Sequence, residues 1–74
     1  MRFEVALFAY HRERHGSSVA IDAEPCVESV LAALDAKGIG VSHCRLAVDE
    51  AIADAGAPLT SCSRLALIPP VSGG

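Results

Sequence analysis

The sequence predicts a single α+β domain in which one main helix packs across a mixed sheet of about five strands. Three observations lead to this fold class. Segments near both ends of the chain alternate apolar and polar side chains as strands do, and one central segment has the apolar spacing of a helix. The third observation is length, because 74 residues provide for one thin aliphatic core and leave no room for a second domain.

The first strand is predicted at the start of the chain. Apolar side chains at every second position are expected to face the core: Phe3, Val5, Leu7 and Ala9. We expect this strand to continue to Tyr10. Phe8 falls on the opposite face, so it is expected either to cover a second apolar layer or to contact a partner.

A hairpin turn is predicted after this strand. Residues 11–16 follow a strand-like run and end in glycine, and a second, antiparallel strand is expected around Val19 and Ile21. His11 and His15 would share one face of a helix, as pairs of metal ligands do. Because a turn is expected instead, and because the glutamate does not match a zinc protease motif, no metal site is predicted here.

The central helix is predicted from its apolar spacing. One stripe follows the helical period: Val27, Val30, Leu31 and Leu34. Pro25 suits the start of a helix, where its missing N–H group would have no partner in any case. Gly38 is placed to end the helix in a left-handed conformation. The apolar stripe is expected to pack on the sheet.

Three further strands are expected after the helix, at residues 45–48, 51–52 and 65–68. A tight turn at residues 49–50 joins the first two. Leu65 and Leu67 are expected to face the core, which leaves Ile68 on the outer face, like Phe8.

Composition excludes several classes of function. The net charge is −3 and the six Lys and Arg residues are scattered, so no basic stripe is present to bind nucleic acid. No apolar run approaches the roughly 20 residues that span a membrane, and no leader is evident at the N-terminus. We therefore expect a cytoplasmic protein without a nucleic-acid or membrane partner.

The cysteines and the polar residues do not predict an autonomous active site. Cys26, Cys44 and Cys62 lack the close spacing of zinc ligands and are odd in number, so they are expected to be reduced, small apolar residues. No spacing typical of a catalytic triad and no glycine-rich phosphate loop is present. The chain is expected to bind no cofactor alone and not to be catalytic by itself.

The end of the chain predicts a tail that carries chemistry. Pro69 and Pro70 cannot donate hydrogen bonds to a strand, so the folded domain is expected to cover residues 1–68 and a flexible tail residues 69–74. Six extended residues reach roughly 20 Å. Gly73 and Gly74 lack side chains, so they can pass through a narrow channel and deliver a carboxylate into the active site of another protein. Activation as an acyl-adenylate would make that carboxylate reactive.

Several segments resemble one known family: Val5 to Ala9, Arg12-Glu13 with Gly16, Val27 to Leu34, Leu46 to Val48, Ala57 to Leu59, and ALIPPVSGG at Ala66 to Gly74. In these the chain resembles the small subunit of molybdopterin synthase, a ubiquitin-like sulfur carrier related to the sulfur carrier of thiamine biosynthesis. The resemblance covers nearly the whole chain, and its last nine residues are the most specific. It implies the β-grasp fold, with the first and last strands as parallel central neighbours.

The resemblance also implies a reaction. A ubiquitin-activating-like adenylyltransferase would use ATP to adenylate Gly74, which is then converted to a thiocarboxylate and threaded into the large catalytic subunit. There the sulfur passes to a cyclic pterin precursor in molybdenum cofactor biosynthesis. The chain would thus be the sulfur-donating subunit of a heteromeric sulfur transferase.

The implied interface with the large subunit consists of apolar residues and the tail, with Gly73 in the partner's channel: Phe8, Ile52, Ile68, Pro69, Pro70, Val71 and Ser72. Arg12 is expected at its polar rim. Two departures from the family pattern affect turns. Asp49 replaces an asparagine, and residues 61–63 (Ser-Cys-Ser) replace Asp-Gly-Asp, so Cys62 is expected either to carry about 1 kcal/mol of strain at a positive φ or to sit in another turn type.

Three other functions stay open at this stage. The chain is also compatible with a sulfur carrier for thiamine thiazole synthesis, which uses a similar fold and Gly-Gly end. It is compatible with a ubiquitin-like modifier joined to lysines through Gly74, and with a passive binding module whose tail is unused. The two prolines before Val-Ser-Gly-Gly favour the pterin pathway.

Overall fold

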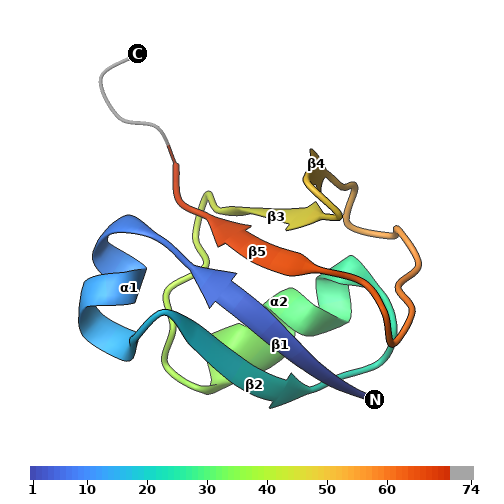
Figure 1. Ribbon diagram of the computed structural model, residues 1–74, viewed down its shortest axis with the longest axis horizontal. Helices are drawn as coiled ribbons and strands as arrows, with labels where there is room; N and C mark the ends of the chain where they lie inside the picture. The colour runs from blue at the N-terminus through green and yellow to red at the C-terminus, as the bar shows by residue number, and fades with distance from the viewer. Residues whose placement is uncertain (71–74) are drawn as a thin grey trace.

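The computed structural model describes residues 1–70, which form a five-stranded mixed sheet with one long helix across one face (Figure 1). The elements in chain order are β1 (Arg2–Leu7), α1 (Ala9–His15), β2 (Ser18–Asp22), α2 (Val27–Ala36), β3 (Arg45–Val48), β4 (Ala51–Ile52) and β5 (Leu65–Ile68). The sheet order is β2-β1-β5-β3-β4; β1 and β5 are parallel, and the other neighbours are antiparallel. The predicted α+β class and the central parallel pair are confirmed.

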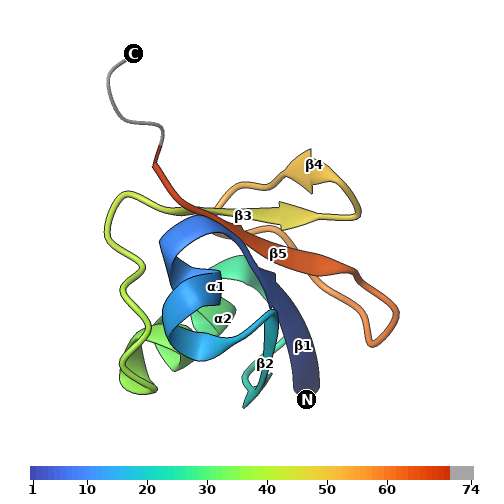
Figure 2. The same ribbon diagram turned by 60° about the vertical axis from the view of Figure 1, so that its left-hand side comes forward.

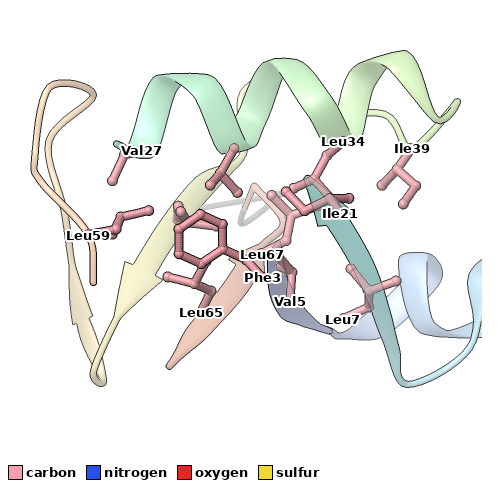
Figure 3. Close-up of a cluster of buried hydrophobic side chains, with 12 residues drawn as sticks. Phe3, Val5, Leu7, Ile21, Val27, Leu34, Ile39, Leu59, Leu65 and Leu67 are labelled. Carbon is pink, nitrogen blue, oxygen red and sulfur yellow. The ribbon is translucent and has the colours of Figure 1, made fainter. Parts of the chain in front are cut away.

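The core lies between the sheet and α2. It is built from the inward side chains of the strands, the apolar stripe of α2 and two loop residues (Figure 3): Phe3, Val5, Leu7, Ile21, Val27, Val30, Leu34, Ile39, Leu46, Leu59, Leu65 and Leu67. The inward strand positions expected at Phe3, Val5 and Leu7, and at Leu65 and Leu67, are confirmed, but Ala9 lies in α1 instead of the strand. With one aromatic ring in this cluster, stability depends on aliphatic burial, about 1.5–3 kcal/mol for each fully buried large side chain.

The hairpin expected at residues 11–16 is wrong, because helix α1 occupies this segment. The strand ends at Leu7, so Tyr10 is helical. A helix of seven residues is too short to be stable alone, and tertiary contacts must hold it. His11 supplies one: its side chain is buried, and its Nε2 donates a hydrogen bond to the Gly40 carbonyl oxygen at 2.7 Å. Gly16, at φ 92°, then ends the helix.

The C-terminus of α2 confirms the predicted role of Gly38. Gly38 has φ 87°, and its N–H group donates to the Asp35 carbonyl at 3.0 Å. The Ile39 N–H group donates to the Leu34 carbonyl at 3.1 Å, and both side chains are buried in the core. These two bonds and the apolar contact form a Schellman motif, which ends the helix and places Ile39 in the core.

The N-terminus of α2 differs slightly from the expectation. Cys26 is the N-cap, so Pro25 precedes the helix and is not in its first turn. The first free N–H groups of the helix bind loop carbonyls instead: Val27 N–H donates to Ala57 O at 3.1 Å, and Glu28 N–H to Ala55 O at 2.8 Å. The loop that precedes β5 thus completes the end of the helix.

The turns at residues 49–50 and 61–63 are the two places where the sequence departs from the family pattern. Asp49 (φ 51°) and Glu50 (φ 72°) are both left-handed, as a tight turn between β3 and β4 requires. The Asp49 Oδ1 atom accepts a hydrogen bond from the Arg64 N–H group at 2.9 Å. Cys62 does not have a positive φ; the turn has another type, closed by a bond from Ser63 N–H to Thr60 O at 3.1 Å.

Replacing Gly38 with alanine is expected to destabilise the fold by about 1 kcal/mol, because a β-carbon disfavours the left-handed conformation. In a domain of this size that corresponds to a fall in Tm of about 4–8 °C. Gly40→Ala is a matched control, since its φ is not in the left-handed region and an added β-carbon meets nothing within 4 Å at either position. Thermal unfolding monitored by circular dichroism checks this; equal Tm values for the two variants would contradict it.

Candidate functional site

A row of small residues crosses the outer face of the sheet, the face turned away from α2. In Figure 1 this face is toward the viewer, with α2 behind the sheet. The strand register aligns one residue from each of the five strands: Ser18, Ala6, Ala66, Ala47 and Ile52. Because neighbours of these residues in β1, β3 and β5 point into the core, this row faces outward. The result is a low apolar strip across the middle of the sheet.

Three larger apolar side chains lie on the same face, Ile52 at the β4 end of the strip and Phe8 and Ile68 beside it. Phe8 is 44% exposed and Ile52 is 50% exposed, while Ile68 is half-buried. Phe8 has an extended backbone (φ −134°, ψ 164°), so it continues the alternation of β1 onto the outer face. The last parallel pair is Leu7 with Leu67, which puts Phe8 and Ile68 at the next position of adjacent chains. We call the strip and these three side chains the docking face.

The docking face adjoins the point where the chain leaves the sheet. β5 ends at Ile68, as the prolines predicted; Pro69 is half-buried and Pro70 is exposed. The end of β5 lies at the same end of the molecule as α1 in both views (Figures 1 and 2). Val71, Ser72, Gly73 and Gly74 lie outside the described residues, so their expected roles stay predictions.

Polar groups surround the docking face. Arg45 pairs with Ile68 across β3 and β5, and Arg12 is exposed on α1, near the end where the tail begins. The outer face also has a hollow of about 290 Å³, lined by Ala6 and Ser18 of the strip together with Glu4, Ser63, Arg64 and Leu65. Charged groups therefore border the strip on this side, and Phe8 and Ile68 lie on the side of the tail.

The described part of the chain offers no metal centre. Within residues 1–70, no group of three or more His, Cys, Asp or Glu residues is arranged to hold a metal ion. His11 and His15, now known to be helical, differ in environment, since His11 is buried and His15 is exposed. Among the helices of residues 1–70, none is long and apolar enough to cross a membrane.

The cysteines lie in different surroundings. All are free thiols; Cys26 and Cys44 are half-buried, and Cys62 is exposed. Burial raises the pKa of the Cys44 thiol, and a hydrogen bond with the Tyr10 hydroxyl offsets part of that rise. The pKa of Tyr10 is raised by desolvation and by the neighbouring Cys44. Cys44 thus lacks the lowered pKa of a reactive cysteine.

The sequence predicted that the large apolar residues Phe8 and Ile68 lie on the outer face, as they do, but not the row of alanines across the strands. Ala6, Ala47 and Ala66 each occupy an outward position of a strand, where polar residues are more usual on a solvated sheet. That departure is visible in the sequence, although the strand register is needed to show that the three alanines form one strip.

Comparisons with known proteins agree with this architecture. The ThiS family model matches residues 5–74. A crystal structure of SAMP1 from Haloferax volcanii is 29% identical in sequence, with 100% of both chains covered and a TM-score of 0.70. A crystal structure of small archaeal modifier protein 1 from H. volcanii is 27% identical, covers 95% of this chain and 98% of the other, and has a TM-score of 0.74. Among curated proteins, no significant match is found.

Cys44 is expected to react with iodoacetamide several times more slowly than Cys62 in the folded protein at mildly alkaline pH. Its raised pKa leaves less thiolate at a given pH, and its thiol is less accessible, because Cys44 is half-buried while Cys62 is exposed. Peptide mass spectrometry over a time course measures both rates. The urea-unfolded chain is the control, in which the difference should disappear; a difference that persists there would show that the fold is not its cause.

Proposed function

This chain belongs to the ThiS family of ubiquitin-like sulfur carriers, and from that premise we propose that it serves as the small, sulfur-donating subunit of molybdopterin synthase. In this role it carries sulfur on the terminal carboxyl group of Gly74 and delivers it to the large catalytic subunit. The acceptor is a cyclic pterin precursor of the molybdenum cofactor.

The proposed reaction uses the terminal carboxylate as cargo. An oxygen of the Gly74 carboxylate attacks the α-phosphorus of ATP in the active site of an adenylyltransferase, and pyrophosphate leaves. Sulfide (HS⁻) from the sulfur source then attacks the carbonyl carbon of the acyl-adenylate; AMP and a proton leave, and a thiocarboxylate remains on the chain. In this scheme ATP and the catalytic groups belong to the partner enzymes, and the chain contributes the carboxyl group.

One observation chiefly supports this proposal: the docking face lies where the chain leaves the sheet for Pro69. A partner that covers Phe8 and Ile68 would hold the base of the tail against its own surface. With the base held, the remaining residues need to span only the distance to the partner's active site. An apolar patch of this kind is typical of a protein-binding surface.

Two alternatives differ from this proposal in the acceptor. The similarity to small archaeal modifier protein 1 from H. volcanii favours a protein modifier, in which the carbonyl carbon of Gly74 forms an isopeptide bond to a lysine. A sulfur carrier for thiamine thiazole synthesis is the other alternative. Reconstitution with the pterin precursor, with the thiazole precursors or with a protein mixture separates the three, since a modifier would give high-mass adducts that resist reductant.

The direct test is intact-mass spectrometry of the purified chain after incubation with the cognate adenylyltransferase, ATP and a sulfur source. The expected product has one terminal oxygen replaced by sulfur. The matched control carries one phenylalanine after Gly74, which should fold normally but not be converted, because a bulky terminal residue does not fit a channel shaped for glycine. No conversion of the unaltered chain, or equal conversion of the extended one, would contradict the proposal.

Ile52→Glu is expected to weaken binding to the large subunit by about tenfold or more, because a charge would be buried in the apolar interface. Ile52 is half exposed, so folding should be unaffected. Ala32→Glu is the control: it makes the same change of charge at an exposed position of α2, on the other side of the molecule. Calorimetric titration gives both affinities, and similar losses for both variants would argue against docking through this face.

A further inference from the structure

A second candidate surface lies between α1 and the loop that follows α2. Here a pocket of about 370 Å³ is lined by Tyr10, His11, Arg14, His15, Gly38 and Gly40. In Figure 2, α1 lies toward the viewer with the loop after α2 beside it. A β-carbon at either glycine would meet nothing within 4 Å, so the space beside the loop is open.

The side chains that line this pocket carry hydrogen-bond donors and no carboxylate. They contribute a guanidinium group, two imidazole rings and a phenol hydroxyl. Glu13, the one acidic residue of α1, is not among them. The ion pair found within residues 1–70 joins Arg2 to Asp22, so Arg14 and His15 have no acidic partner in this part of the chain. Arg14 is therefore a cation beside the pocket without an ion-pair partner among the described residues, in a chain of net charge −3.

His11 contributes no free hydrogen-bond donor to the pocket. The carbonyl oxygen of Gly40 can only accept a hydrogen bond, so Nε2 carries the proton in the 2.7 Å contact. The Nδ1 atom is buried and has no partner among the described residues, and His11 as a whole is only 1% exposed. In this tautomer Nδ1 is a hydrogen-bond acceptor, so a carboxylate cannot pair with it, and the donors of the pocket are those of the other side chains.

The position of the pocket links it to the tail. α1 begins directly after Phe8, at the end of the sheet where β5 leads to Pro69. Arg14 lies six residues beyond Phe8, about 9 Å along the helix. A standard interface buries roughly 800 Å² on each partner, a patch about 30 Å across. An enzyme that takes up the tail at this end can therefore reach the pocket in the same contact.

We propose that this pocket receives an acidic side chain of the adenylyltransferase that activates the C-terminus, with Arg14 as its main ligand. Guanidinium binds carboxylate through two parallel hydrogen bonds, and the ring of His15 supplies a further donor. A nucleic-acid phosphate is disfavoured, because such binding needs many cations and the chain is acidic overall. This inference rests on the proposed function.

A purely structural role of the basic residues makes a different prediction. Arg14 and His15 lie in the last turn of α1, where cations stabilise the helix dipole. In that case their replacement would affect the stability of the chain but not the affinity of the folded protein for the enzyme.

The test compares Arg14→Glu with Arg2→Glu, which makes the same change of charge at the opposite end of β1. Affinity for the adenylyltransferase without ATP is measured by calorimetry at low and high salt, after circular dichroism has shown that both variants are folded. Arg14→Glu should weaken binding about tenfold at low salt and less at high salt, while Arg2→Glu should change it less than about twofold. Affinities of the two variants within about twofold of each other, or no binding by the unaltered chain, would overturn the proposal.

A second measurement tells a failure of the pocket proposal from a failure of the proposed function. It is the yield of thiocarboxylate when the adenylyltransferase is saturating. If the unaltered chain is converted and the two variants bind equally well, the pocket proposal alone fails. If the unaltered chain is not converted but Arg14→Glu still binds more weakly than Arg2→Glu, the pocket proposal stands and the proposed sulfur transfer fails.

Discussion

The parallel pairing of β1 with β5 is the interaction on which the rest of the structure depends. It joins the first and last strands of the described chain at the centre of the sheet and buries Val5, Leu7, Leu65 and Leu67 against α2. Because the two strands run in the same direction, their C-terminal ends lie side by side at one end of the sheet. This direction brings α1 and the start of the tail to one end of the molecule.

The alternation of strand side chains divides the sheet between two tasks. Inward residues pack with α2 and supply the stability that a small domain can obtain from aliphatic burial. On the outward face Ala6, Ala47 and Ala66 leave an apolar strip suited to another protein, with charged residues such as Glu4 and Arg45 beside it. The same two-residue period therefore gives one face that holds the fold together and another that is free to bind.

Much of this architecture could be predicted from local patterns, and the failures have physical causes. The strands, α2 and the left-handed Gly38 follow from periodicity and from the special conformation of glycine. Helix α1 could not be predicted in this way, because it is held by the contact of His11 with a residue 29 positions away. The strip of Ala6, Ala47 and Ala66 was missed for a related reason, since only strand register aligns it. The Pro-Pro motif located the end of β5, whereas the proposed chemistry at Gly74 rests on the family resemblance.

The brevity of β4 has a consequence for solubility. A sheet with an apolar outer face is prone to stack or to extend with other copies, and exposed edge strands are the usual route. Here one edge is a strand of two residues, Ala51–Ile52, which offers almost no backbone for a further strand to pair with. At that edge the sheet therefore offers too little backbone to be extended by a strand of another copy.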